Sequence, residues 1–280
     1  MVHTYLEVFS IADNKNIRIL TERTFMYQTI SNASFSVDTF FFISGLLVTI
    51  TYFRTVSKKL PKEEKACDVV TSNFFKFLML VIYRFFRLTP AYLFVLGLNE
   101  IILRSLHSYS VFTPAIIDHI SCSNFWWRNA LYINNFYPQT EFCMLWSWYI
   151  ANDTQFYLIA IALLLIAARG EKHLKFAGTA LGVFLVASWI MTFIIAMKYQ
   201  YVIRVEEPFA LFDQLYDKPW MRIGPYFIGM MAGYFLFRVN CEIKLSPLIV
   251  MTGWILSVAC LGSLLYGVGR QGLVIPVSAF

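Results

Sequence analysis

The sequence predicts an all-α, polytopic membrane protein: a bundle of about six transmembrane helices. Of its 280 residues, 58% are hydrophobic and only 14% are charged, whereas soluble domains are roughly 45–50% apolar and about 25% charged. The mean hydropathy is +0.60, and 18% of the residues are aromatic, which is typical of helices whose ends lie at a membrane interface. Backbone groups in lipid must be satisfied within each segment, which favours helices. This composition excludes a disordered chain, a coiled coil and a nucleic-acid-binding domain.

Six segments come close to the roughly 20 mostly apolar residues that a spanning helix needs. Two of them, Phe176–Met197 and Pro247–Gly269, contain no charged residue. The other four are short or carry one or two charges: Val37–Phe53, Leu88–Leu106, Leu145–Ala168 and Trp220–Phe237. The apolar segment Met1–Phe9 is expected to be the remnant of a further N-terminal span, and no cleavable signal peptide is predicted. Both ends of the chain are expected to be truncated.

The distribution of basic residues predicts which segments face the cytosol. Arg54–Arg87 holds eight lysines and arginines, whereas His107–Ser147, of similar length, holds only Arg128. Because cytosolic loops carry an excess of Lys and Arg, we expect Arg54–Arg87 in the cytosol and His107–Ser147 outside. The protein is therefore expected to be an integral, multi-pass protein of the plasma membrane or an endomembrane, with membrane lipids as partners.

Two features belong to the side assigned to the outside. Asn32-Ala33-Ser34 is an N-glycosylation sequon, so Asn32 is predicted to carry a glycan. Cys122 and Cys143 share the outer segment, where an oxidising compartment would allow them to form a disulfide. The other cysteines fall in cytosolic or membrane segments and are expected to be free thiols: Cys67, Cys241 and Cys260.

Three acidic residues lie at or within predicted spans: Asp38, Glu100 and Asp153. Intramembrane ionisable groups are costly and mark functional sites by default. Asp38 and Asp153 also fit helix capping, and Glu100 fits a pair with Arg104 four residues later, so both interpretations stay open.

Small residues are spaced for close helix packing in two places, Gly178-x-x-x-Gly182 and Gly229-x-x-x-Gly233. Such pairs let helix backbones approach closely in membranes. They are also common by chance in glycine-containing spans, so the prediction is a weak one.

Arg84 and Arg87 lie three residues apart just before Pro90, so they share a helix face at the expected cytosolic end of a span. Two guanidinium groups there can bind the phosphates of an anionic cosubstrate or contact lipid headgroups. His3, beside the initiator methionine, is by itself typical of a surface residue. The sequence has no Ser-His-Asp spacing, metal-ligand cluster or phosphate-binding glycine loop, so we expect no metal and no bound cofactor.

Motifs along nearly the whole chain resemble one family of membrane proteins. They lie at His3–Tyr5, Val37–Phe41, Ser44–Val48, Tyr83–Pro90, Trp126–Pro138, Cys143–Tyr149, Ala151–Leu158 and Pro219–Tyr226. In these motifs the chain resembles the invertebrate "nose resistant to fluoxetine" proteins, a branch of membrane acyltransferase family 3. The resemblance implies an integral membrane O-acyltransferase that moves acyl groups, other than amino-acyl groups, from a cytosolic acyl thioester to a hydroxyl acceptor. The implied cosubstrate is an acyl-CoA-type donor.

The resemblance also implies roles for individual residues. His3 matches the family histidine and is expected to act as a general base, which Asp38 could orient if their helices pack together. Arg84 and Arg87 match the family arginine pair and are expected to bind the donor. The family arginine ten residues before the histidine has no counterpart here, because it would precede the first residue. We therefore expect residues 1–280 to be a partial acyltransferase domain with weak or no activity on its own; a transporter of lipids or small hydrophobic compounds and an inactive fragment are the alternatives.

Overall fold

The computed structural model describes residues 27, 29, 35–57, 66–109, 118–201, 211–243 and 245–266. They form seven α-helices: α4 (Phe35–Ser57), α5 (Ala66–Tyr109), α6 (Asp118–Ala130), α7 (Trp148–Ala167), α8 (Glu171–Lys198), α9 (Pro219–Arg238) and α10 (Pro247–Tyr266). Three 3-10 turns precede α7 and a π-helical turn, Phe212–Tyr216, precedes α9. The described residues contain no strand, which confirms the predicted all-α fold. His3, Asn32, the N-terminal segment Met1–Phe9 and the last 14 positions lie outside the described residues.

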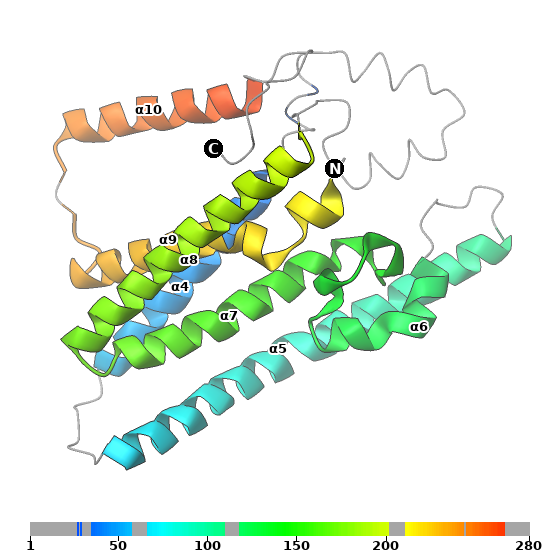
Figure 1. Ribbon diagram of the computed structural model, residues 1–280, viewed down its shortest axis with the longest axis horizontal. Coiled ribbons are helices and arrows are strands. Elements are labelled where there is room, and N and C mark those ends of the chain that lie inside the picture. The colour runs from blue at the N-terminus through cyan, green and yellow to red at the C-terminus, as the bar shows by residue number, and fades with distance from the viewer. Residues whose placement is uncertain are drawn as a thin grey trace.

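Four of the helices, α4, α7, α8 and α9, pack together as a bundle (Figure 1). α4 and α9 make the most extensive contact and run in the same direction, since Asp38 pairs with Arg222 near their beginnings and Phe53 stacks on Phe237 near their ends. α5 lies along the side of α7 that faces away from α4 and α8. α10 is set apart from the bundle. The core is aromatic and aliphatic, with Phe41, Phe156, Tyr226, Phe227 and Met230 almost completely buried.

Five helices are long and apolar enough to cross a membrane: α4 (Phe35–Val56), α5 (Thr71–Tyr109), α7 with its preceding turn (Leu145–Ala167), α8 (Glu171–Lys198) and α10 (Pro247–Tyr266). Each overlaps one of the predicted spans. The sixth predicted span, Trp220–Phe237, is a 20-residue helix, α9, but it is not among these five in the described part of the chain. The structure therefore confirms a multi-pass helical bundle and assigns α9 to its packed centre.

The helix that contains the predicted span Leu88–Leu106 begins well before Leu88. α5 is one helix of 44 residues that continues through Pro90, so it is about 66 Å long at 1.5 Å per residue. Lys76, Arg84 and Arg87 interrupt the apolar run before Leu88, so hydropathy alone does not extend the predicted span to this part of the helix. Proline is tolerated inside membrane helices, and charged side chains are tolerated where they face the bundle interior. Arg84 and Arg87 thus lie within a helix instead of at its end.

Close backbone contact between α4 and α9 depends on glycine. A Cβ atom built on Gly45, Gly229 or Gly233 would lie within 2.6 Å of a carbonyl oxygen of the facing helix. The prediction of close packing at Gly229 and Gly233 is therefore confirmed. The same prediction for Gly178 and Gly182 is wrong as far as the described residues go, because a Cβ atom at either position would meet none of their atoms within 4 Å.

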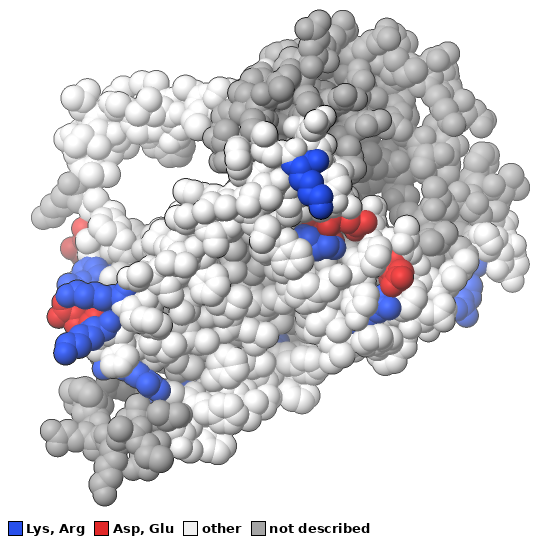
Figure 2. Space-filling view, in the orientation of Figure 1, with Lys and Arg blue, Asp and Glu red and all other residues white. Residues whose placement is uncertain are grey.

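Basic residues gather at one end of the bundle, which we call the basic end: Arg54, Arg169, Lys172, Lys175 and Arg238. They lie where α4 and α9 end and where α7 turns into α8. Figure 2 shows a group of Lys and Arg side chains at the left, with acidic side chains among them, next to a flank that is almost free of charge. The opposite end carries residues 118–147, which we call the cap and which comprise α6 and the 3-10 turns. An uncharged flank between two polar ends suits a bundle that spans a bilayer.

Candidate active site

Polar side chains from four helices meet inside the bundle. Arg84 of α5 donates a hydrogen bond to the carboxylate of Asp153 of α7, forming an ion pair. Ser44 of α4 donates to the other carboxylate oxygen at 2.7 Å. The Arg84 guanidinium lies 4.2 Å from the centre of the Tyr157 ring, and Tyr226 of α9 interacts electrostatically with both members of the ion pair. We call these five residues the central polar cluster.

The central polar cluster lies within the helical bundle and not at one of its mouths. Only 15% of the Arg84 side chain and 17% of the Asp153 side chain are exposed. Arg84 lies 18 positions after the start of α5, which corresponds to about 27 Å along the helix. Removing both charges from water is costly unless further hydrogen bonds satisfy them, and Ser44 supplies one of these. A buried ion pair at this position is a functional candidate by default.

A cavity of about 310 Å³ adjoins the cluster between α5, α7 and the cap. Arg84 and Tyr157 form part of its wall, and the cap segment 130–133 closes one side. Most of the lining is apolar, but Thr154 and Gln155 add polar groups. Among the described residues, the Thr154 hydroxyl and the Nε of Arg84 are buried without a hydrogen-bond partner. A mostly apolar cavity with a few polar groups is the usual form of a small-molecule site.

The other sequence-predicted residues lie apart from the cluster. Arg87 is exposed on α5, so the structure does not bring both arginines to one buried site. Asp38 pairs with Arg222 of α9 at 3.0 Å, and Arg222 in turn donates to the Tyr216 carbonyl oxygen at 2.9 Å. The contact between Asp38 and His3 stays a prediction, because His3 lies outside the described residues.

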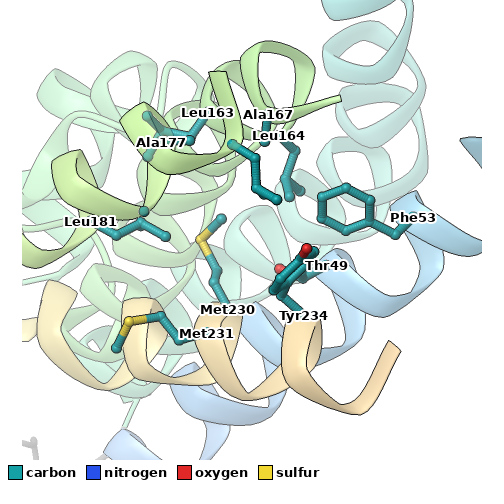
Figure 3. A pocket seen from close by; sticks show the side chains of 12 residues that line it. Thr49, Phe53, Leu163, Leu164, Ala167, Ala177, Leu181, Met230, Met231 and Tyr234 are labelled. Carbon is teal, nitrogen blue, oxygen red and sulfur yellow. The ribbon is translucent and has the colours of Figure 1, made fainter. Parts of the chain in front are cut away.

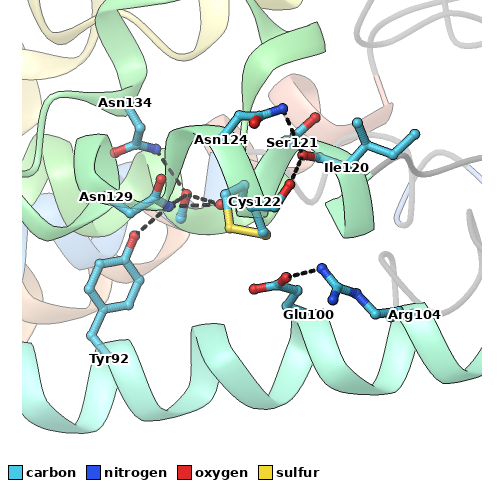
Figure 4. Close-up of a disulfide and its surroundings, with 12 residues drawn as sticks. Tyr92, Glu100, Arg104, Ile120, Ser121, Cys122, Asn124, Asn129 and Asn134 are labelled. Carbon is cyan, nitrogen blue, oxygen red and sulfur yellow. Dashed lines mark hydrogen bonds and ion pairs between the residues drawn. A yellow bond between two sulfur atoms is a disulfide. The ribbon is translucent and has the colours of Figure 1, made fainter.

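The cap is held by the predicted disulfide, Cys122–Cys143, which the structure confirms (Figure 4). Asn129 is completely buried beside it and donates to the Cys143 carbonyl oxygen at 2.7 Å and to the Tyr92 hydroxyl of α5 at 2.9 Å. The bond to Tyr92 attaches the cap to α5. The predicted pair Glu100–Arg104 on the same helix is also confirmed, at 2.7 Å.

A second set of bonds joins the two residues before α9, Asp217 and Lys218, to the cap and to α7. The Lys218 ammonium donates to the Asn135 carbonyl oxygen and to the Asp217 carboxylate, each at 2.8 Å. Asn152 of α7 donates to the Asp217 carbonyl oxygen at 2.8 Å and is completely buried. Burial raises the pKa of the Asp217 carboxyl to about 6, although the hydrogen bond and charge of Lys218 act in the opposite direction.

The described residues contain no group of three or more His, Cys, Asp or Glu side chains that could hold a metal ion. Cys241 and Cys260 are free thiols, as predicted, whereas the side chain of Cys67 lies outside the described part of the chain.

The sequence profile of a family described as an acyltransferase domain matches residues 1–280, the whole chain. The chain belongs to this acyltransferase family. It is 29% identical to nose resistant to fluoxetine protein 6 of Caenorhabditis elegans over 273 residues, a match that covers 90% of this chain and 32% of the relative. The chain thus spans about a third of that relative's length. No solved structure matches it.

Three pairings in this acyltransferase domain were not predicted from the sequence. They join Ser44 to Asp153, Arg84 to Asp153, and Asp38 to Arg222. The sequence contains one feature that predicts such ion pairs. A charged residue in one span with no opposite charge within four positions needs a partner from another span. Asp153 meets that condition in its predicted span, whereas Arg84 lies before the predicted span Leu88–Leu106.

Proposed function

We propose that the protein is a membrane O-acyltransferase that moves acyl groups, other than amino-acyl groups, from a cytosolic acyl-CoA-type thioester to a hydroxyl acceptor. Membership of the acyltransferase family supports the reaction class. One observation carries the site: the Arg84–Asp153 ion pair forms part of the polar cluster beside a mostly apolar cavity of about 310 Å³. Such a cavity can hold an acyl group with its carbonyl directed at the polar residues.

In the proposed reaction, His3 takes the proton from the acceptor hydroxyl, and the oxygen attacks the thioester carbonyl carbon. A new C–O bond forms and the C–S bond breaks, and the departing thiolate receives the proton from His3. Negative charge develops on the carbonyl oxygen meanwhile, and a buried guanidinium is well suited to stabilise it. Arg84 fits this role because Asp153 fixes its position while its Nε is left without a protein partner among the described residues. The resemblance implies that Arg87 binds the anionic part of the donor, and this role stays a proposal because Arg87 is exposed one turn nearer the cap than Arg84.

The orientation belongs to the same proposal. The basic end faces the cytosol, in agreement with the positive-inside rule, and the cap with its disulfide faces the oxidising side. The basic residues lie where α7 turns into α8, whereas the Cys122–Cys143 disulfide joins α6 to the start of α7 at the opposite end of the bundle (Figure 1), which supports this arrangement. Asn32 is then on the side where a glycan can be attached.

The test is transfer of labelled acyl groups from acyl-CoA into membrane lipids by the full-length protein. Arg84→Met is expected to lower the rate by about 100-fold, the usual effect of losing one group that stabilises an oxyanion. His3→Ala should abolish transfer, and Arg104→Met, which removes an exposed arginine of the same helix, should leave it unchanged. Equal transfer by His3→Ala would reject His3 as the base, and equal transfer by Arg84→Met would reject the cluster as the site.

Lipid transport is the alternative function, and it needs a polar pathway. The three acidic residues that could line one are each in an ion pair: Asp38, Glu100 and Asp153. Uptake of a hydrophobic compound that survives loss of His3 and Arg84 but fails without these acids would favour transport. A full-length protein that accumulates in membranes without transfer or uptake would favour an inactive protein.

A further inference from the structure

A second cavity lies between α4, α7, α8 and α9, away from the central polar cluster and towards the basic end. Its volume is about 170 Å³. Figure 3 shows side chains from all four helices around it, among them Leu164 of α7, Leu181 of α8 and Met230 of α9. Thr49 also lines it, but the Thr49 hydroxyl donates to the Gly45 carbonyl oxygen within α4 at 2.9 Å. Apolar cavities of this kind stay dry and take up hydrocarbon.

The cavity opens sideways between α8 and α9. These helices are joined near the cap end, where the Ser188 hydroxyl donates to the Trp220 carbonyl oxygen at 2.6 Å. Towards the basic end, Gly178 and Met231 line the cavity and are exposed. A Cβ atom at Gly178 would meet no atom within 4 Å, so the glycine leaves the mouth open. In a bilayer, a hydrocarbon chain could therefore enter from the surrounding lipid.

Two cations follow the lining residues of α8 and α9 towards the basic end. Lys175 precedes Gly178 by three positions on α8, and Arg238 follows Tyr234, another lining residue, by four positions on α9. Residues three or four apart share a helix face, so both cations lie on the faces that form the cavity, nearer its basic end. Lys175 also pairs with Glu171 at 2.9 Å, but basic residues outnumber acidic ones at this end of the bundle.

We propose that this cavity binds one acyl chain of an anionic phospholipid, whose headgroup lies against the basic end. Basic pockets between membrane helices bind anionic headgroups in this way, and the cytosolic leaflet, which the basic end faces under the proposed orientation, is the anionic one. A cavity of about 150 Å³ accommodates benzene, so this one holds about six to eight carbons of a chain. The remaining carbons lie along the exposed surface of α8 and α9. The proposal does not depend on acyl transfer.

The chain offers a matched pair of variants for the test. Gly178→Leu places a side chain in the mouth of the cavity, whereas Gly182→Leu adds the same side chain one turn further along α8, at a position that does not line it. Neither substitution meets an atom within 4 Å at Cβ, and both replace glycine in a helix with a better helix former. Any difference between the two variants therefore reports on the cavity and not on folding.

The experiment is photolabelling of the full-length protein in vesicles of equal parts phosphatidylcholine and phosphatidylserine. The probe is phosphatidylserine with a diazirine in one acyl chain, and labelled peptides are mapped to α8 and α9. Gly178→Leu is expected to lower labelling there by about ten-fold, a change of about 1.4 kcal/mol in binding, while Gly182→Leu leaves it unchanged. The double variant Lys175→Gln/Arg238→Gln should lose the preference for phosphatidylserine over phosphatidylcholine. Lys198→Gln, at the other end of α8, should keep that preference.

Three outcomes would overturn the proposal. The first is equal labelling of the wild type and Gly178→Leu, which would place the bound chain elsewhere. The second is equal competition by unlabelled phosphatidylcholine and phosphatidylserine, which would remove the role of the basic end. The third is displacement of the probe by octanoyl-CoA but not by unlabelled phosphatidylserine, which would assign the cavity to the acyl donor.

Discussion

Arg84 and Asp153 are 69 positions apart in the sequence and form an ion pair inside the helical bundle. The pair joins α5 to α7, and Ser44 adds α4 through its hydrogen bond to the same carboxylate. Both charged side chains are more than four-fifths buried. An unpaired charge at such a site is very unfavourable, so the pair fixes how these three helices pack while it positions the guanidinium beside the cavity.

Asp153→Asn should destabilise the protein by about 3–5 kcal/mol, because it leaves the Arg84 charge buried without a counter-charge. The double variant Arg84→Met/Asp153→Asn should recover most of that loss, since no unpaired charge is left. Thermal unfolding of the detergent-solubilised full-length protein measures both. Glu100→Gln is the control: it breaks an exposed pair on α5 and should cost at most about 0.5 kcal/mol. A double variant no more stable than Asp153→Asn would show that the buried charge is not the cause.

The disulfide should stabilise the cap. Cys122 and Cys143 are 21 positions apart, and closing a loop of this length contributes about 3 kcal/mol in the chain-entropy account. Cys122→Ser and Cys143→Ser should each lower the free energy of unfolding by that amount, and combining them should add little. Mass-tagged maleimide counts the thiols before and after reduction, and thermal unfolding reports the stability. Cys260→Ser, which removes an exposed free thiol, should change neither stability nor the number of thiols released by reduction.

The α4–α9 interface should not tolerate side chains at its glycines. A Cβ atom at Gly229 would lie 2.1 Å from the Phe42 carbonyl oxygen, and backbone cannot move aside as a side chain can. Gly229→Leu is therefore expected to cost more than the roughly 1–3 kcal/mol usual for overpacking and to reduce the yield of monodisperse protein in size-exclusion chromatography. Gly253→Leu in α10, where a Cβ atom would meet nothing within 4 Å, should behave like the wild type. A monodisperse, stable Gly229→Leu protein would contradict the close approach of the two helices.

The spans were predictable because lipid acts on each segment separately. A run of apolar residues must lie in the membrane whatever its neighbours do, so hydropathy located α8 and α10 almost to their ends. The disulfide was predictable for a similar reason, since Cys122 and Cys143 share one segment on one side. Hydropathy did not predict the first half of α5, where Lys76, Arg84 and Arg87 interrupt the apolar run although Arg84 pairs with Asp153 of α7. It could not show that residues 66–87 belong to the same helix.

The candidate site was only partly predictable. Arg84 was singled out by the resemblance, but its partner is set by how α5 packs against α7, and no local pattern records that contact. Asp38 was expected to cap its helix or to orient His3, whereas the structure pairs it with Arg222 of α9, 184 positions away. The Asp38–Arg222 pair follows from the parallel packing of α4 and α9. That packing depends on glycines whose spacing is common by chance.

The stability of the attachment between cap and bundle should depend on pH through Asp217. Its carboxyl is completely buried, and burial raises its pKa from 3.8 to about 6. Between about pH 4 and pH 6 the folded protein therefore holds a proton that the unfolded chain has released, so stability rises as the pH falls through this window. Above about pH 6 the full cost of the buried charge is present. Asp217→Asn removes this contribution, so its unfolding temperature should change less than that of the wild type between about pH 7 and pH 5.

In the Asp217→Asn variant, Lys218 retains its bond to the Asn135 carbonyl oxygen. This bond limits the loss of stability that follows from removing the charge of Asp217. Glu171→Gln serves as the control, because Glu171 is an exposed acid at the basic end and its loss should leave the wild-type pH dependence intact. The measurement is the unfolding temperature of the wild type, Asp217→Asn and Glu171→Gln over a series of pH values. If Asp217→Asn kept the full pH dependence, other titrating groups would be responsible for it, and the buried Asp217–Lys218 pair would be only a structural contact.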